Sequence, residues 1–224
     1  MAISVITVAN QKGGVGKTNT VINLAVQLEV MGYGPVVLLD TDAPQGTLSG
    51  WFNEREQETP AMTTLAPGVS LAAKIKELEA QNYRFLIIDT GPRDPGREPF
   101  IAEVIRAADL VLIPTKVSWK DSKALVPTLN CCTQYSKKFL FVMNEVKPNL
   151  SLTPQVIAML SQYGPIAPNF IGSRAAFLNS DVDGLAACEL DARGAAALDI
   201  QALIKTVLSH LPQYAKPLKE KKRV

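Results

Sequence analysis

Few residues of this sequence carry thiol or imidazole chemistry. Three of its 224 residues are cysteine and one is histidine. The cysteines, Cys131, Cys132 and Cys188, are odd in number and lack a Cys-x-x-Cys spacing, which argues against a disulfide framework or a zinc site. His210 lies near the C-terminus, so we do not expect a catalytic Ser–His or Cys–His pair.

A long apolar run is also missing. No segment approaches the roughly 20 apolar residues of a membrane-spanning helix. Residues 1–9 lack the basic start and the cleavage site of a signal peptide, so we expect a cytoplasmic protein without a membrane partner. Hydrophobic residues make up 47% and charged residues 20%, as in ordinary globular domains. The length suits one domain, residues 1–211, followed by a short tail, residues 212–224.

The net charge of +2 is unevenly distributed. The segment 216–224 carries five basic residues and one acidic residue, so it holds +4 and leaves −2 for the rest of the chain. Such a tail suits binding to nucleic-acid phosphates, and it equally suits a merely solubilising terminus. The basic residues are Lys216, Lys219, Lys221, Lys222 and Arg223.

Apolar strands alternate with helical segments along the chain. This order predicts an α/β fold, a doubly wound and mostly parallel sheet with helices on both faces. Residues 59–69 read as a loop, and residues 169–171 as a short strand. The main predicted strands are 5–9, 36–39, 85–88, 110–114 and 139–143. The predicted helices are 19–31, 47–58, one capped by Ser70, 100–108, 120–135, 153–163 and 194–211.

A glycine-rich loop, residues 11–18, joins the first strand to the first helix. In this order a strand, a loop and a helix N-terminus form a cradle for nucleotide phosphates. Lys17 is expected to reach the β- and γ-phosphates, and Thr18 to bind Mg²⁺. The usual pattern has glycine at Gln11, and here a second lysine, Lys12, follows it. The candidate nucleotide-binding residues are Gly13, Gly14, Val15, Gly16, Lys17, Thr18 and Asn19.

Three aspartates follow predicted strands, at the sheet edge where ligands bind in such folds. Asp89 comes after four apolar residues and is expected to hold Mg²⁺ through its water shell. Asp40 and Asp42 alternate, so one would face the metal and the other the γ-phosphate, where a carboxylate can orient the attacking water. Taken singly, each aspartate could merely cap a turn; beside a phosphate loop, we interpret them as functional.

Together, residues 12–18, 40–46 and 85–90 resemble the ParA/MinD family of deviant Walker ATPases, and the short length resembles the small ParA (ParF-like) partition proteins. The resemblance covers residues 1–211. It implies Mg²⁺-dependent ATP hydrolysis in an ATP-dependent sandwich homodimer, in which Lys12 contacts the partner's ATP and Asp42 positions water. Asp40 would lie near the Mg²⁺ shell, and Asn144 would contact adenine, although a plain turn asparagine fits that position nearly as well.

The resemblance further implies non-specific DNA binding, a ParB-like adaptor that stimulates hydrolysis, and association with the nucleoid in the ATP-bound state. The implied function is segregation of plasmid or chromosomal DNA. A MinD-like or protein-cluster positioning ATPase, a metabolic P-loop ligase and a non-hydrolysing ATP-binding scaffold are the alternatives. Prolines 212 and 217 and a weak apolar face disfavour a MinD-like membrane helix. Ala43 separates Asp42 from the Pro-Gln pair that usually follows, which is a departure from the family pattern.

Overall fold

The sheet of this protein is built from strands that all run parallel. The computed structural model describes residues 2–41, 46–66, 68–91, 98–118 and 122–214. Within them, six strands are hydrogen-bonded in the order β3-β2-β4-β1-β5-β6. The strands are β1 (Ser4–Val8), β2 (Val36–Asp40), β3 (Ala61–Thr63), β4 (Phe85–Asp89), β5 (Leu110–Lys116) and β6 (Phe139–Asn144).

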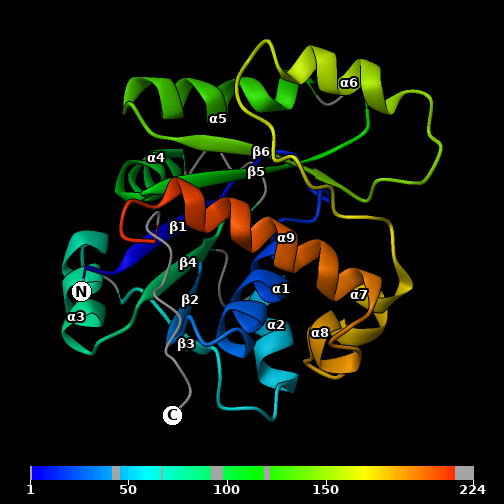
Figure 1. Cartoon of the computed structure of the whole chain (residues 1–224). Coiled ribbons are helices and arrows are strands. Elements are labelled where there is room, and N and C mark those ends of the chain that lie inside the picture. Colours follow the sequence, from blue (N-terminus) through cyan, green and yellow to red (C-terminus); the bar gives the residue numbers. More distant parts are fainter. Residues whose placement is uncertain (1, 42–45, 67, 92–97, 119–121, 215–224) are drawn as a thin grey trace.

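Helices cover both faces of the sheet, as predicted (Figure 1). One face carries α1 (Lys17–Val30), α2 (Thr47–Glu54), α7 (Ala175–Asp181), α8 (Ala187–Leu190) and α9 (Ala195–His210). The other carries α3 (Leu71–Ala80), α4 (Glu98–Ala107), α5 (Ser122–Gln134) and α6 (Thr153–Leu160). No helix in the described part of the chain is both long and apolar enough to cross a membrane.

Side chains along each central strand alternate between the two faces. In β1, Ile6 and Val8 pack into the core beneath α1 and α9, whereas Val5 packs on the opposite side with residues of α3 and α4. Because both faces are covered, every residue of β1, β2 and β4 is buried. This explains why these strands read as continuous apolar runs rather than as alternating patterns.

Two sequence expectations were wrong. The segment 59–69 is not purely loop, because Ala61–Thr63 forms β3 and pairs with β2 at the sheet edge. Its three half-buried residues carry no strong local pattern, and pairing with β2 decides their structure. The expected strand at 169–171 is replaced by single bridges at Ile166 and Gly172.

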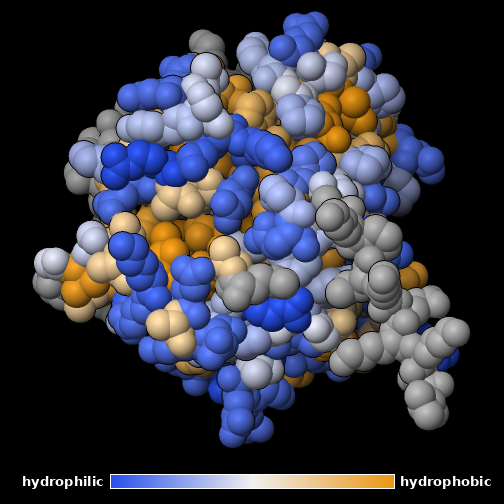
Figure 2. All heavy atoms as spheres, turned by 60° about the vertical axis from the view of Figure 1, so that its left-hand side comes forward, coloured by the Kyte–Doolittle hydropathy of each residue, from blue (hydrophilic) through white to orange (hydrophobic). Residues whose placement is uncertain are grey.

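After α9 the chain returns to the amino-terminal edge of the sheet. The ring of Tyr214 stacks on Phe85 at 5.1 Å between centroids and meets Tyr33 edge-to-face at 6.2 Å. The guanidinium of Arg84 lies 5.7 Å from the Tyr214 centroid. Figure 2 turns this side of the molecule toward the viewer, and hydrophilic side chains there surround smaller hydrophobic areas. The basic residues predicted to bind DNA, 216–223, lie outside the described residues.

Candidate functional site

A cavity of about 370 Å³ lies at the carboxyl ends of β1, β2 and β4. It brings together the phosphate loop, the start of α1 and two of the three predicted carboxylates. Val15, within this loop, is buried and does not line the cavity. The residues around the cavity are Gly13, Gly14, Gly16, Lys17, Thr18, Asn19, Asp40, Gly46, Thr47, Asp89, Thr90 and Gly91.

The phosphate loop has a backbone that only glycine adopts easily. Gly14 and Gly16 have φ values of 69° and 86°, in the left-handed region. A Cβ atom on Gly16 would also overlap the side-chain amide of Asn144. The loop therefore combines two positive φ angles with close contact to a buried side chain, and both features fix its shape.

Asn144, at the end of β6, supports this loop from below. Its Nδ2 donates to the carbonyl of Val15 at 2.8 Å, and its Oδ1 accepts from the N–H of Glu145 at 2.9 Å. Asn144 is 1% exposed and is not among the residues that line the cavity. The structure thus gives it a bracing contact with the loop, and contact with adenine stays a prediction.

The start of α1 presents a positive end to the cavity. The helix has no acidic residue in its first turn, so nothing within that turn offsets its N-terminal partial charge. Lys17, only 7% exposed, folds back so that its Nζ donates to the carbonyl of Lys12 at 3.1 Å. An anion in the cavity would meet both the helix end and this ammonium group.

Sequence reasoning missed Asn10, which fixes the entry to the loop. Its Nδ2 donates to the carbonyl of Pro114 in β5 at 2.8 Å, and its Oδ1 accepts from the N–H of Lys12 at 2.9 Å. Asn10 is buried, whereas Lys12 is half-buried at the start of the loop. A polar residue directly after an apolar strand was the available signal for Asn10.

Oxygen atoms gather on the side of the cavity formed by β2 and β4. The Thr18 hydroxyl donates to Oδ2 of Asp89 at 2.6 Å. Asp40, paired in register with Asp89, accepts at its Oδ2 from the N–H and the hydroxyl of Ser49 at 3.0 and 2.8 Å. A Cβ on Gly46 would overlap the Asp40 carboxylate. One hydroxyl and two carboxylates are the donors that Mg²⁺ prefers, so these residues fit a magnesium site.

Ser49 was not predicted, since nothing in the sequence links it to Asp40, nine positions earlier. Asp42, the predicted water-positioning residue, lies outside the described residues together with 43–45. The proposed role of Asp42 therefore stays a prediction.

The far end of α2 is held by the C-terminal part of the chain. The Arg55 side chain, 1% exposed, forms a two-pronged ion pair with Glu189, 2.8 Å at the closest approach, and donates to the carbonyls of Gly184 and Thr59. Trp51 Nε1 donates to the carbonyl of Leu185 at 2.9 Å, and its ring lies under the Arg55 guanidinium. Through α2, the cavity wall at Thr47 is connected to α7 and α8.

The segment that carries the phosphate loop is similar to known proteins. A family model described as an AAA domain matches residues 3–66, which hold the loop and Asp40. The maintenance of carboxysome distribution protein A of Halothiobacillus neapolitanus is 28% identical over 201 residues, 87% of this chain and 91% of that protein. Protein ParA of Rhizobium radiobacter is 32% identical over 114 residues, 50% of this chain and 48% of that protein.

The fold is similar to that of solved structures. The septum site-determining protein MinD of Pyrococcus horikoshii, solved in complex with Mg-ADP, superposes with a TM-score of 0.71 over 96% of this chain and 99% of that one, at 17% identity. The chain is thus similar in sequence to the carboxysome distribution protein and to ParA, and similar in fold to MinD. Its second loop lysine, Lys12, lies beside Gly13 at the cavity wall.

Proposed function

We propose that this chain is a positioning ATPase that binds and hydrolyses Mg²⁺-ATP in the cavity at the ends of β1, β2 and β4. The observation that carries the proposal is the convergence of Lys17, the α1 N-terminus and the Thr18–Asp89 pair on one cavity. Bound Mg²⁺ would offset negative charge on the phosphate oxygens. Thr18 would bind the metal directly, and Asp40 and Asp89 would hold its water ligands.

Each of the following residues then has its own role in hydrolysis. Backbone N–H groups of the loop and Lys17 bind and orient the phosphates, which positions the γ-phosphate for in-line attack. Asp42 orients the attacking water. Lys12 acts across a homodimer and adds a second cation to the partner's phosphates, as an arginine finger does.

The dimer is tested by light scattering with and without ATP. The Asp42→Ala variant, which should bind ATP without hydrolysing it, is expected to accumulate as a dimer. Lys12→Ala should stay monomeric. Lys137→Ala, which removes a lysine just before β6, at the amino-terminal ends of the strands, should behave as the parent does. A monomer in every ATP-containing sample would overturn the sandwich mechanism.

The basic tail is proposed to give the ATP-bound dimer its affinity for DNA, irrespective of sequence, and thereby for the nucleoid. Phosphate contacts made by lysine and arginine weaken steeply with salt. Two unrelated duplexes should therefore bind equally at low salt, in fluorescence anisotropy, and release together as salt rises. Deleting residues 216–224 should remove most of this affinity; unchanged binding would move the DNA surface onto the body of the protein.

A ParB-like adaptor is proposed to stimulate hydrolysis and to link the ATPase to its cargo. The cargo is either a DNA molecule, as in plasmid or chromosome partition, or a protein body. The relative named for carboxysome distribution, which the chain matches over most of its length, favours the protein body. Deleting the gene and measuring plasmid loss beside the spacing of protein bodies in cells separates the two.

A further inference from the structure

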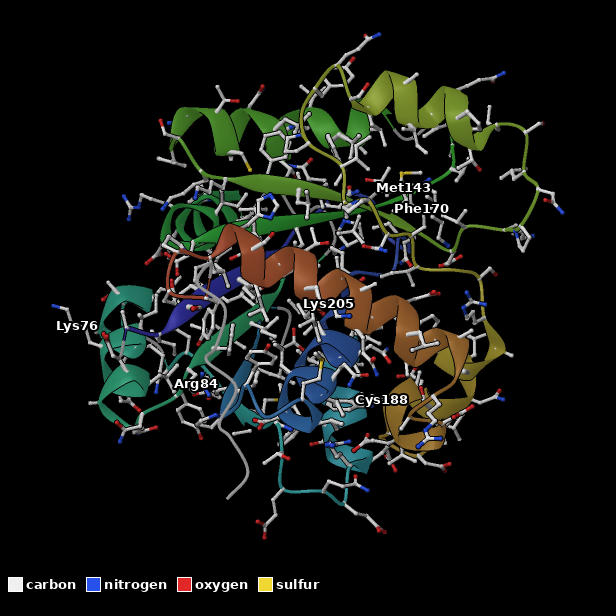
Figure 3. The ribbon with its side chains drawn as sticks, in the orientation of Figure 1. Lys76, Arg84, Met143, Phe170, Cys188 and Lys205 are labelled. Atoms are coloured by element: carbon white, nitrogen blue, oxygen red, sulfur yellow. The ribbon has the colours of Figure 1, made fainter. Side chains whose placement is uncertain are left out.

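A second cavity, of about 550 Å³, opens at the end of β6 on the face covered by α4, α5 and α6. Its floor includes Phe170, which packs in the same cluster as Met143, and the two lie side by side in Figure 3. It shares no lining residue with the phosphate cavity. The lining residues are Val146, Lys147, Pro148, Asn149, Leu150, Thr153, Pro154, Ile157, Ala158 and Phe170.

Most of this lining is apolar. Val146, Ile157 and Phe170 are half-buried and form the deeper part, whereas Leu150 is 39% exposed. Pro148 and Pro154 are exposed as well, so the cavity continues into an open apolar surface. Covering such side chains releases roughly 25 cal/mol per Å² of apolar area, which favours an apolar occupant larger than a single small group.

The polar features of this cavity all favour a negative or hydrogen-bonding group. Lys147 is exposed, and no acidic residue lines the cavity. The neighbouring Glu145 is paired with Lys116 at 2.7 Å. Helix α6 begins here with no side-chain cap and no acidic residue in its first turn, so its positive end is not offset there.

Thr153, at the start of α6, adds an independent observation. It lines the cavity, is 9% exposed, and its buried hydroxyl has no hydrogen-bond partner among the described residues. A buried hydroxyl without a partner costs stability, so such groups normally have one. A ligand in this cavity would supply a hydrogen-bond partner for the Thr153 hydroxyl.

We propose that this cavity docks a segment of a partner protein that carries an apolar side chain next to a carboxylate. The apolar side chain fills the space between Phe170 and Ile157. The carboxylate lies between Lys147 and the start of α6, where the charge is complementary. The exposed apolar rim extends the contact along the partner chain, beyond what a small carboxylic acid covers.

The docking site is structurally linked to the phosphate loop. The N–H of Val146 donates to the carbonyl of Ile171 at 3.0 Å, and Asn144, two residues earlier, holds Val15. An occupant would therefore contact the segment that continues from Asn144, the residue that holds the phosphate loop. Identifying this occupant with the adaptor rests on the proposed function, whereas docking itself is measured without nucleotide, so the two can fail separately.

The test uses the full chain without nucleotide and three probes followed by ¹⁵N NMR. The acidic peptide N-acetyl-Leu-Glu-Leu-Glu-Leu-Glu-amide is expected to shift signals of residues 146–158 in a saturable manner. The basic peptide with lysine in place of glutamate should not. Equal shifts from both peptides would overturn the proposal. Saturation by octanoate at the same concentration as the acidic peptide would overturn it too, since the site would then take a small amphiphile.

Variants locate the contact. Lys147→Glu should weaken the acidic peptide about fivefold, the magnitude expected for reversing one charge near a helix N-terminus. Lys205→Glu makes the same change on the exposed surface of α9 and should leave the affinity unchanged. Thr153→Val keeps the shape of the side chain and should weaken binding without lowering the melting temperature. Equal effects of Lys147→Glu and Lys205→Glu would refute docking at this cavity.

Discussion

The hydroxyl of Thr18 lies 2.6 Å from Oδ2 of Asp89, although 71 positions separate the two residues in the sequence. A hydroxyl held by a carboxylate at the end of a strand is in place to bind Mg²⁺ on one side and to keep its hydrogen bond on the other. Thr18→Ala should therefore weaken nucleotide binding about tenfold or more in the presence of Mg²⁺. Binding in EDTA should change little.

The measurement is titration with a fluorescent ATP analogue, with and without metal. Thr18→Ser, which keeps the hydroxyl, is the matched control and should retain most of the affinity. An equal loss of affinity with and without Mg²⁺ would assign Thr18 a structural role instead.

Ser49 is predicted to position Asp40 for the metal. Ser49→Ala removes the 2.8 Å hydroxyl contact and leaves the backbone N–H contact in place. Loss of one hydrogen bond to a charged group, about 1.5–3 kcal/mol, should lower the apparent Mg²⁺ affinity by about tenfold or more. Stimulation of nucleotide binding by Mg²⁺ is the readout, with Ser161→Ala, which removes an exposed hydroxyl just after α6, as the control. An unchanged Mg²⁺ titration would remove Ser49 from the site.

Asn144→Ala should destabilise the phosphate loop. It leaves the carbonyl of the buried Val15 without its 2.8 Å hydrogen bond, which costs about 1–3 kcal/mol. Urea unfolding should show this loss, and hydrogen exchange should rise in residues 12–16. Asn169→Ala, an exposed asparagine near the same sheet edge, should have neither effect. Loss of ATP affinity with unchanged exchange would instead favour the direct adenine contact.

Arg55 is predicted to be a major contributor to stability. Arg55→Met leaves Glu189, only 20% exposed at its side chain, without its cation, and should lower the free energy of unfolding by about 3 kcal/mol. Arg55→Lys keeps the charge but loses the two-pronged contact, so its loss should be smaller but still clear. A double variant with Glu189→Gln should recover part of the loss of Arg55→Met, and additive losses would show that the pair is not coupled.

The three thiols should differ in reactivity. Burial, reinforced by the neighbouring Cys131, raises the pKa of Cys132 to about 12. Burial and the charge of Glu189 raise the pKa of Cys188 to about 11. Raised pKa values mean that both thiols stay protonated between pH 7 and pH 9, where only thiolates react readily. Iodoacetamide labelling followed by mass spectrometry should modify the half-buried Cys131 first; early labelling of Cys188 would contradict this assignment.

The sequence predicts the sheet well wherever a strand is buried on both faces. The apolar runs of β1, β2 and β4 are long enough to be recognised, and the carboxylates that end β2 and β4 mark the wall of the cavity. The places of Lys17 and Thr18 at the cavity can be predicted from the spacing of one short motif. The glycines of this motif set the shape of the loop, and the shape of the loop determines where these two side chains lie.

What escaped prediction depends on contacts between distant parts of the chain. The short β3 forms because it pairs with β2, and α8 is held against the end of α2 by the ion pair between Arg55 and Glu189. Local residue pattern does not encode such pairings. The hydrogen bonds from Ser49 to Asp40 and from Asn144 to Val15 could not be predicted either, because only the folded sheet brings these residues together.

The aromatic contact of Tyr214 fixes the position of the chain after α9. Tyr214 stacks on Phe85, at the start of β4, whereas Asp89 at the other end of the same strand lines the phosphate cavity. Four strand steps separate them, about 13 Å. The last described residue therefore lies at the amino-terminal ends of the strands, and a second copy of the chain that approached the phosphate cavity would meet the opposite end of the sheet.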